Sequence, residues 1–147
     1  MFTSIVWATD GSPAADAALP YVESLAASPD AKVTVVHADQ HFLGRGGGYS
    51  ALADEPELRT KIRAQTEALV ANGIDATFVA VVGTTEKTGD LIADAAKDAE
   101  ADVIVVGSHG HGALASAVIG SVTTRLLHVA PCPVLAVPAR VAATAAV

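Results

Sequence analysis

The sequence contains one cysteine, few basic residues and no long apolar run. Cys132 has no second cysteine for a disulfide within the chain, and it lies between two prolines without a histidine spaced to share a metal, so we interpret it as a packing residue. No stretch reaches the ~18 consecutive apolar residues that a transmembrane helix needs. The first apolar segment, 4–8, has no basic residues before it and is followed at once by Asp10, which is not typical of a secretory signal. We therefore expect a cytoplasmic protein.

Positive charge is also scarce, with 9 Lys and Arg against 16 Asp and Glu and a net charge of -7. Non-specific binding to nucleic acid or to an anionic membrane depends on Lys and Arg that neutralise phosphate, so the balance argues against both partners. Local dipoles would have to bind any anionic ligand. At 147 residues, 51% of them hydrophobic, the chain predicts a single domain over 1–138, followed by a flexible tail at 139–147.

Short apolar runs rich in β-branched residues recur along the chain, at 4–8, 32–38, 76–82, 102–106 and 134–137. Runs that are apolar on successive residues are typical of strands buried on both faces of a parallel sheet. Helical patterns alternate with them: from Ser12 and Pro13 to Leu25, from near Pro56 to Gly73, from about Gly89 to Ala99 and from about Ser121 to Val129. This alternation predicts a doubly wound α/β sheet, with a ligand site beyond the carboxyl ends of the strands where the strand order reverses.

The glycine-rich segment 43–50, LGRGGGYS, falls between the second predicted strand and the second predicted helix. It resembles a phosphate-binding loop in composition, but no GK[ST] follows it and it opens no helix. We therefore interpret it as a mobile surface loop.

A second glycine-rich segment, 107–125, contains no lysine. Gly107 directly follows a buried strand, Gly110 and Gly112 allow a sharp turn, and Gly120-Ser121-Val122-Thr123 opens the last helix. The start of a helix presents unpaired N–H groups and a partial positive charge, so it can bind an anion without a lysine. From composition alone, a tight turn at 107–112 and a packing glycine at Gly120 explain the segment equally well.

The spacing of Gly107, Gly110, Gly120 and Ser121 matches G-2x-G-9x-G-[S/T], which is the nucleotide-binding pattern of the universal stress protein family. The C-terminal block GSHGHGALASAVIGSVTTRLLHVAPCPVLAVP resembles that family along its length. So do IVWATDGSPAADAAL near the N-terminus and VTVVHA in the second predicted strand. The resemblance covers nearly the whole chain.

This resemblance implies a Rossmann-like, five-stranded parallel sheet in the order 3-2-1-4-5, with four main helices on its two faces. It also implies an adenine-nucleotide site, foremost for ATP, with Mg²⁺ held mainly by the phosphates and with no ligand to the metal assigned to the chain. Asp10, with Ala8 and Thr9 beside it, would contact the ribose, the backbone of Ala38 the adenine, and Val106 would pack near the base. The residues implied for the phosphates are Gly107, Gly110, Gly120, Ser121 and Val122. Beside them, the hydroxyls of Ser121 and Thr123 can donate to the same ligand. A homodimer would form through the last strand, 134–137.

Several of these side chains have a second interpretation. Asp10, placed just before Ser12, could simply brace its turn. His109 and His111 flank Gly110 in the expected phosphate site, and His111 stands where many family members carry Arg or Lys. An imidazole is largely neutral at pH 7 and supplies a full charge only when it is protonated. His37 and His128 are interpreted as structural, and Arg125 as either a phosphate ligand or half of a surface ion pair.

The resemblance leaves three classes of function open. One is a dimeric stress-response regulator that holds ATP, or in a variant AMP or cyclic AMP. Another is a slow ATPase, although hydrolysis needs cationic stabilisation of the transferred phosphoryl group and the sequence places no fixed lysine there, so we expect at most weak hydrolysis. The third is a dimeric interaction protein without a ligand, which the intact glycine motif argues against.

Overall fold

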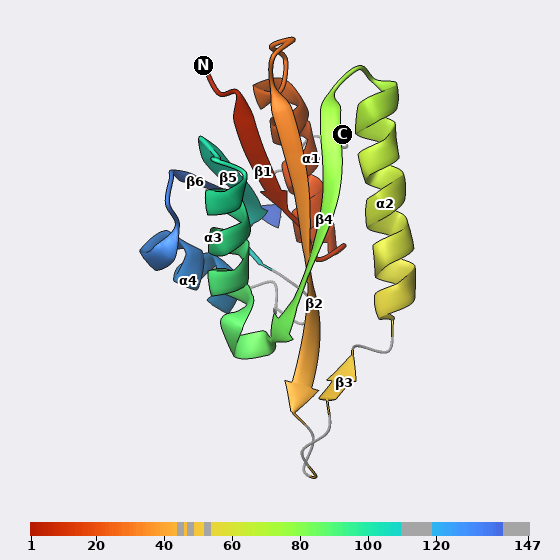
Figure 1. The fold of residues 1–147 in the computed structure, drawn as a ribbon, viewed down its shortest axis with the longest axis vertical. Coiled ribbons are helices and arrows are strands. Elements are labelled where there is room, and N and C mark those ends of the chain that lie inside the picture. Colours follow the sequence, from red (N-terminus) through yellow and green to blue (C-terminus); the bar gives the residue numbers. More distant parts are fainter. Residues whose placement is uncertain (44–45, 47–48, 52–53, 110–118, 140–147) are drawn as a thin grey trace.

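The computed structural model describes residues 1–43, 46, 49–51, 54–109 and 119–139, and in them one six-stranded sheet lies between two layers of helices (Figure 1). Five strands are parallel, and their spatial order is β4-β2-β1-β5-β6. Their bounds are β1 Ser4–Ala8, β2 Lys32–Leu43, β4 Asp75–Thr84, β5 Val103–Gly107 and β6 Val134–Val137. Counted along the chain, this is the order 3-2-1-4-5, so the predicted fold class is confirmed.

The central strands are buried on both faces, as their apolar runs predict. In β1, Ile5 and Trp7 belong to one core and Val6 and Ala8 to the other. Successive side chains of a strand point to opposite faces, so two cores on opposite sides require an apolar residue at every position.

Helices α1 (Pro13–Leu25) and α2 (Glu55–Ala71) cover one face of the sheet, and α3 (Thr88–Asp98) and α4 (Ser121–Val129) cover the other (Figure 1). A short 3-10 helix, η1 (Thr85–Lys87), precedes α3. The first helix begins where the sequence predicts, because the Ser12 hydroxyl accepts a hydrogen bond from the Ala15 N–H at 3.3 Å and proline occupies the first turn. None of the helices in the described ranges has the length and apolar character required to span a bilayer.

The prediction for 43–50 is wrong at both ends of the segment. Strand β2 extends to Leu43, and β3 (Tyr49–Ala51) pairs antiparallel with it from His41 to Leu43. The extension carries polar residues, which conceal it from an apolar pattern, and its other side pairs with β4 as far as Thr84. Residues 44, 45, 47 and 48 of this segment, and the tail beyond 139, lie outside the described residues.

At the amino ends of the strands, Asp102 fixes β1 beside β5. Its Oδ2 accepts hydrogen bonds from the Thr3 N–H, the Ser4 N–H and the Thr3 hydroxyl at 2.8–3.0 Å. The backbone N–H groups of Thr3 and Ser4 and the Thr3 hydroxyl lower the pKa of Asp102 by stabilising its charged form. These hydrogen bonds at the amino ends fix the register between β1 and β5. The carboxyl ends of β1 and β5 therefore lie level with each other at the opposite edge of the sheet.

Candidate functional site

The carboxyl ends of β1 and β5 lie side by side at the point where the strand order reverses. Ala8 is level with Val106 across the two strands, and β2 pairs with the other side of β1. The segments that follow these strands are therefore neighbours, at the edge where an open α/β sheet binds ligands. This is where the sequence places the nucleotide site.

The turn Thr9–Gly11 after β1 is braced by its own side chains. The Gly11 N–H donates to the Thr9 hydroxyl at 3.1 Å, and the Ser12 N–H donates to Asp10 Oδ1 at 3.0 Å. Gly11 has φ +74°, a left-handed conformation that favours glycine. Asp10 thus braces its turn, as one of its two interpretations expects, and its contact with ribose stays a prediction.

Gly107, at the end of β5, lies directly against the backbone of α1. A Cβ built on Gly107 would be 2.7 Å from both the carbonyl carbon and the carbonyl oxygen of Ala14. The Gly107 carbonyl also accepts a hydrogen bond from the buried Thr123 hydroxyl at 2.9 Å. Gly107 and Thr123 therefore join α1, β5 and α4 at the predicted site, whether or not they also contact a phosphate.

Replacing Gly107 with alanine is expected to lower the free energy of unfolding by about 1–3 kcal/mol, the usual cost of overpacking. The neighbours of the added methyl group are backbone atoms, so α1 as a whole would have to move. Urea denaturation of the variant measures the loss. Gly46→Ala is the matched control, because nothing lies within 4 Å of its built Cβ, and an equal loss in both variants would contradict the explanation.

Helix α4 starts with its first N–H groups beside the end of β5. Gly120 is the N-cap, its N–H donates to the Ser108 carbonyl at 2.7 Å, and its carbonyl accepts from the Thr124 N–H at 2.9 Å. A glycine N-cap has no side chain to accept from the first-turn N–H groups, which leaves Ser121 and Val122 suited to an external anion. The site therefore has the dipole that the sequence predicts.

Two predicted site residues, Gly110 and His111, lie outside the described residues, as do all of 110–118. His109 is described, and its Nδ1 lies 2.8 Å from the Ser108 hydroxyl. Ala38 is half-buried in β2, two residues beyond the position level with Ala8. The structure thus brings the described members of the predicted set to one edge of the sheet.

Two cations on the neighbouring helices α2 and α4 are engaged in ion pairs. Arg125 donates two hydrogen bonds to Asp90, at 2.9 and 3.1 Å, and this guanidinium lowers the pKa of the Asp90 carboxyl. The surface ion pair is therefore the interpretation of Arg125 that the structure supports. Lys61 Nζ lies 2.6 Å from Asp16 Oδ2 and donates to the Gly11 carbonyl at 2.7 Å.

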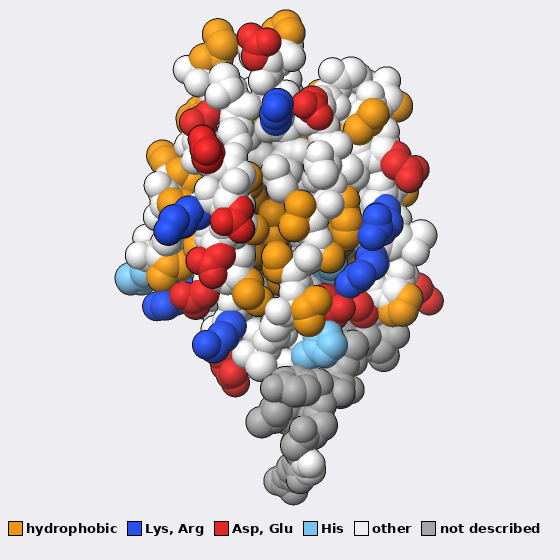
Figure 2. Space-filling view, viewed as in Figure 1, with side chains coloured by type: hydrophobic (Ala, Val, Ile, Leu, Met, Phe, Trp, Pro, Cys, Tyr) orange, Lys and Arg blue, Asp and Glu red, His pale blue; other side chains and the backbone are white. Residues whose placement is uncertain are grey.

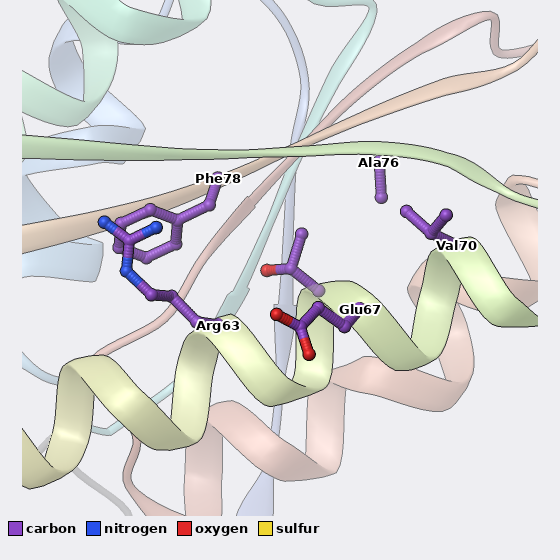
Figure 3. Close-up of a pocket in the computed structure, with 6 residues that line it drawn as sticks. Arg63, Glu67, Val70, Ala76 and Phe78 are labelled. Carbon is purple, nitrogen blue, oxygen red and sulfur yellow. The ribbon is translucent and has the colours of Figure 1, made fainter.

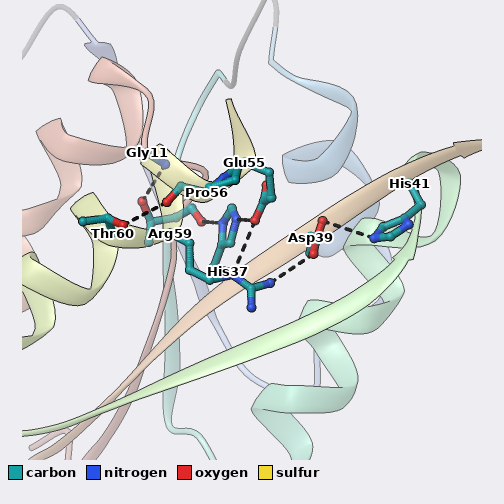
Figure 4. Close-up of polar contacts among 9 residues, drawn as sticks. Gly11, His37, Asp39, His41, Glu55, Pro56, Arg59 and Thr60 are labelled. Atoms are coloured by element: carbon teal, nitrogen blue, oxygen red, sulfur yellow. Dashed lines mark hydrogen bonds and ion pairs between the residues drawn. The ribbon is translucent and has the colours of Figure 1, made fainter. Parts of the chain in front are cut away.

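A buried polar network lies beneath the β1 turn (Figure 4). Its central residue, His37, is structural as the sequence predicts, but its partners Glu55 and Thr9 escaped the prediction. His37 is 2% exposed, with Nε2 2.6 Å from Glu55 Oε1 and Nδ1 3.0 Å from the Thr9 carbonyl oxygen. Next to this pair, Asp39 accepts from Arg59 at 3.0 Å. The alternation of polar residues at 37 and 39 along β2 is a signal for this network, since it places both side chains on the α2 face.

A cavity of about 260 Å³ lies between α2 and β4 (Figure 3), where the Arg63 guanidinium is 4.4 Å from the centre of the Phe78 ring. Its lining contains none of the predicted site residues: Arg63, Thr66, Glu67, Val70, Ala76 and Phe78. Within the described ranges, no three His, Cys, Asp or Glu side chains group as metal ligands.

Comparison with known proteins agrees with this fold. The family model of the universal stress protein family matches residues 1–138. The chain belongs to the universal stress protein family. A universal stress protein of Thermus aquaticus is 34% identical over 140 residues, which are 93% of this chain and 99% of that protein.

Solved structures of this family share the fold of the chain. The structure of hypothetical protein MJ0577 has a TM-score of 0.76 at 24% identity and covers 94% of this chain and 96% of its own. A universal stress protein in complex with cAMP has a TM-score of 0.66 at 24% identity, and the match covers 94% of this chain and 98% of that protein. An Arabidopsis thaliana member with AMP bound has a TM-score of 0.63 at 18% identity, and the match covers 92% of this chain and 90% of that protein.

Proposed function

We propose that this universal stress protein binds an adenine nucleotide at the carboxyl edge of β1 and β5, foremost ATP with Mg²⁺ held mainly by the phosphates. The observation that carries the proposal is that the start of α1, which follows the Thr9–Gly11 turn, and the start of the glycine-capped α4 both contact Gly107. A hydroxyl- and carboxylate-bearing turn suits a ribose, and uncapped helix N–H groups suit a phosphate. The relatives with cAMP and AMP support adenine as the base.

The electrostatics of the site favour holding a nucleotide over hydrolysing it. Arg125 is paired with Asp90, and Lys61 is engaged by Asp16 and Gly11. Both cations are thus engaged by protein groups, which reduces the positive charge that either could offer to a transferred phosphoryl group, and phosphoryl transfer requires such charge. Figure 2 shows the face formed by α3, β4 and α2, on which Lys and Arg side chains stand among Asp and Glu.

The regulatory part of the proposal is a homodimer that acts as a sensor or switch in the cytoplasm. Strand β6 stands at an edge of the sheet, as the predicted dimer contact requires, and Leu135 on this strand is 37% exposed. Helix α4 directly precedes β6 in the chain. If two sheets join edge to edge at β6, the α4 of each protomer therefore lies near the contact between the protomers. Occupation of the site could then change how the dimer meets a protein partner.

The test is to identify the ligand that the purified protein carries and to titrate the emptied protein. We expect mass spectrometry of the released ligand to find an adenine nucleotide. Calorimetry should then show saturable binding of ATP and a much weaker response to GTP. AMP or cyclic AMP in place of ATP would correct the ligand within the same class, and accumulation of ADP would favour the slow ATPase. No heat from any adenine nucleotide would contradict the proposal and favour a ligand-free interaction protein.

A further inference from the structure

We propose that His37 is a positioning residue of the nucleotide site, held by Glu55 and fixing the Thr9–Gly11 turn from beneath. This inference rests on the proposed function and deepens it. His37 is placed for the role by the alternation of β2, which directs His37 and Asp39 toward α2 and directs Ala38 to the opposite face. The imidazole therefore supports the turn without taking the space expected for the base beside Ala38.

The contact with the turn fixes the tautomer of His37. A carbonyl oxygen can only accept, so at 3.0 Å from the Thr9 oxygen the Nδ1 atom must carry a hydrogen and donate it. The opposite nitrogen, Nε2, lies 2.6 Å from Glu55 Oε1. A single hydrogen lies between Nε2 and Oε1, whichever atom carries it. Either an imidazolium donates to a carboxylate, or a carboxyl group donates to a neutral imidazole.

Burial makes this arrangement rigid. His37 is 2% exposed and Glu55 is 5% exposed, so water cannot replace either hydrogen bond if the ring turns. The ring is therefore held at both nitrogens, and the Thr9 carbonyl is held with it.

Helix α2 supports the same turn at two more points. Lys61 Nζ donates to the Gly11 carbonyl at 2.7 Å, and a Cβ built on Gly11 would lie 2.8 Å from Leu58 Cδ2. Together with Glu55, these residues come from the first two turns of α2. The position of Asp10, between Thr9 and Gly11, thus depends on α2 as well as on β1.

Two substitutions of Glu55 separate positioning from simple filling of space. In Glu55→Gln the side-chain amide can donate to Nε2, so Nδ1 still donates to Thr9, and affinity for ATP should stay within about twofold of wild type. In Glu55→Ala the ring loses its anchor, and affinity should fall about tenfold, the factor that one lost hydrogen bond of ordinary strength represents. Both affinities are measured by calorimetry well below the melting temperature of each variant.

The matched control is Arg59→Met. Arg59 belongs to the same network, through Asp39 and through a 3.8 Å approach to Glu55, but no contact joins it to the turn in the described structure. Its affinity for ATP should stay within about twofold of wild type, because a partly exposed ion pair contributes little. A tenfold loss in Arg59→Met would mean that any disturbance of the network weakens binding, and would overturn the assignment to His37.

A second measurement needs no nucleotide. Long-range nitrogen–proton NMR of the wild-type protein should show His37 protonated at Nδ1, and the amide signals of Thr9, Asp10 and Gly11 should shift in Glu55→Ala but not in Glu55→Gln. Turn amides indifferent to Glu55→Ala would overturn the proposal. An unprotonated Nδ1 in the wild type would overturn it as well, even if a variant failed to fold. If the wild type binds no adenine nucleotide, the proposed function fails, while these signals still decide whether His37 holds the turn.

Discussion

Replacing Gly120 with valine is expected to weaken the binding of adenine nucleotides at least about a hundredfold, equivalent to about 2.7 kcal/mol of binding free energy. Gly120 is the N-cap of α4, where the first N–H groups of the helix would meet a phosphate. A branched side chain there would occupy the space through which phosphate oxygens approach those groups. Calorimetric titration with ATP measures the loss.

The fold should tolerate this substitution. Gly120 has φ −62° and ψ 157°, an extended conformation that valine adopts readily, so the melting temperature should change little. Gly46→Val is the control for a glycine-to-valine change, because nothing lies within 4 Å of its built Cβ, and it should leave ATP affinity unaltered. Equal affinity in Gly120→Val and wild type would place the phosphates elsewhere.

Replacing His37 with leucine is expected to lower the free energy of unfolding by about 3 kcal/mol, the upper end of the usual cost of leaving a buried polar group without its hydrogen-bond partner. Leucine is similar in size, so the loss comes from the Glu55 carboxyl, which stays buried with an apolar neighbour in place of a hydrogen-bond partner. Urea denaturation measures the loss as a lower midpoint at an unchanged slope.

A double-mutant cycle isolates the pair. His37→Leu combined with Glu55→Met removes both polar groups, and this variant should recover most of the stability lost in His37→Leu, because apolar replacements often match a buried pair. Asp90→Ala is the control, since its ion pair with Arg125 is exposed and should matter little. A double variant no more stable than His37→Leu would show that the Thr9 contact alone accounts for the loss.

The order of strands and helices was predictable because each signal is local. Continuous apolar runs marked the parallel strands, and Ser12 with Pro13 marked the start of α1. At β2 and β3 the pattern failed. Residues 39–41 are polar, yet they lie in the strand because β4 pairs with one side of them and β3 continues the pairing at His41 on the other.

Some features of the candidate site were also predictable from the sequence, and others were not. The glycine spacing and the turn after β1 were visible in the sequence, and the structure brings Thr9, Gly107 and Gly120 to one edge of the sheet. The dual role of Gly107 was not visible, because nothing near it in sequence shows that α1 approaches its Cα. The ion pair of Arg125 is 35 residues distant in sequence and was left open for the same reason.

The sequence by itself determined the class of fold, the family and the segments that meet at the carboxyl edge of β1 and β5, since periodicity, helix caps and motif spacing act over a few neighbouring residues. Only the tertiary structure decided that His37 stands between Thr9 and Glu55 and that α2 supports the β1 turn. Residues 9, 37 and 55 are brought together by the pairing of β1 with β2 and the packing of α2 on the sheet. Burial then turns an ordinary histidine and glutamate into a hydrogen-bonded pair that water cannot replace.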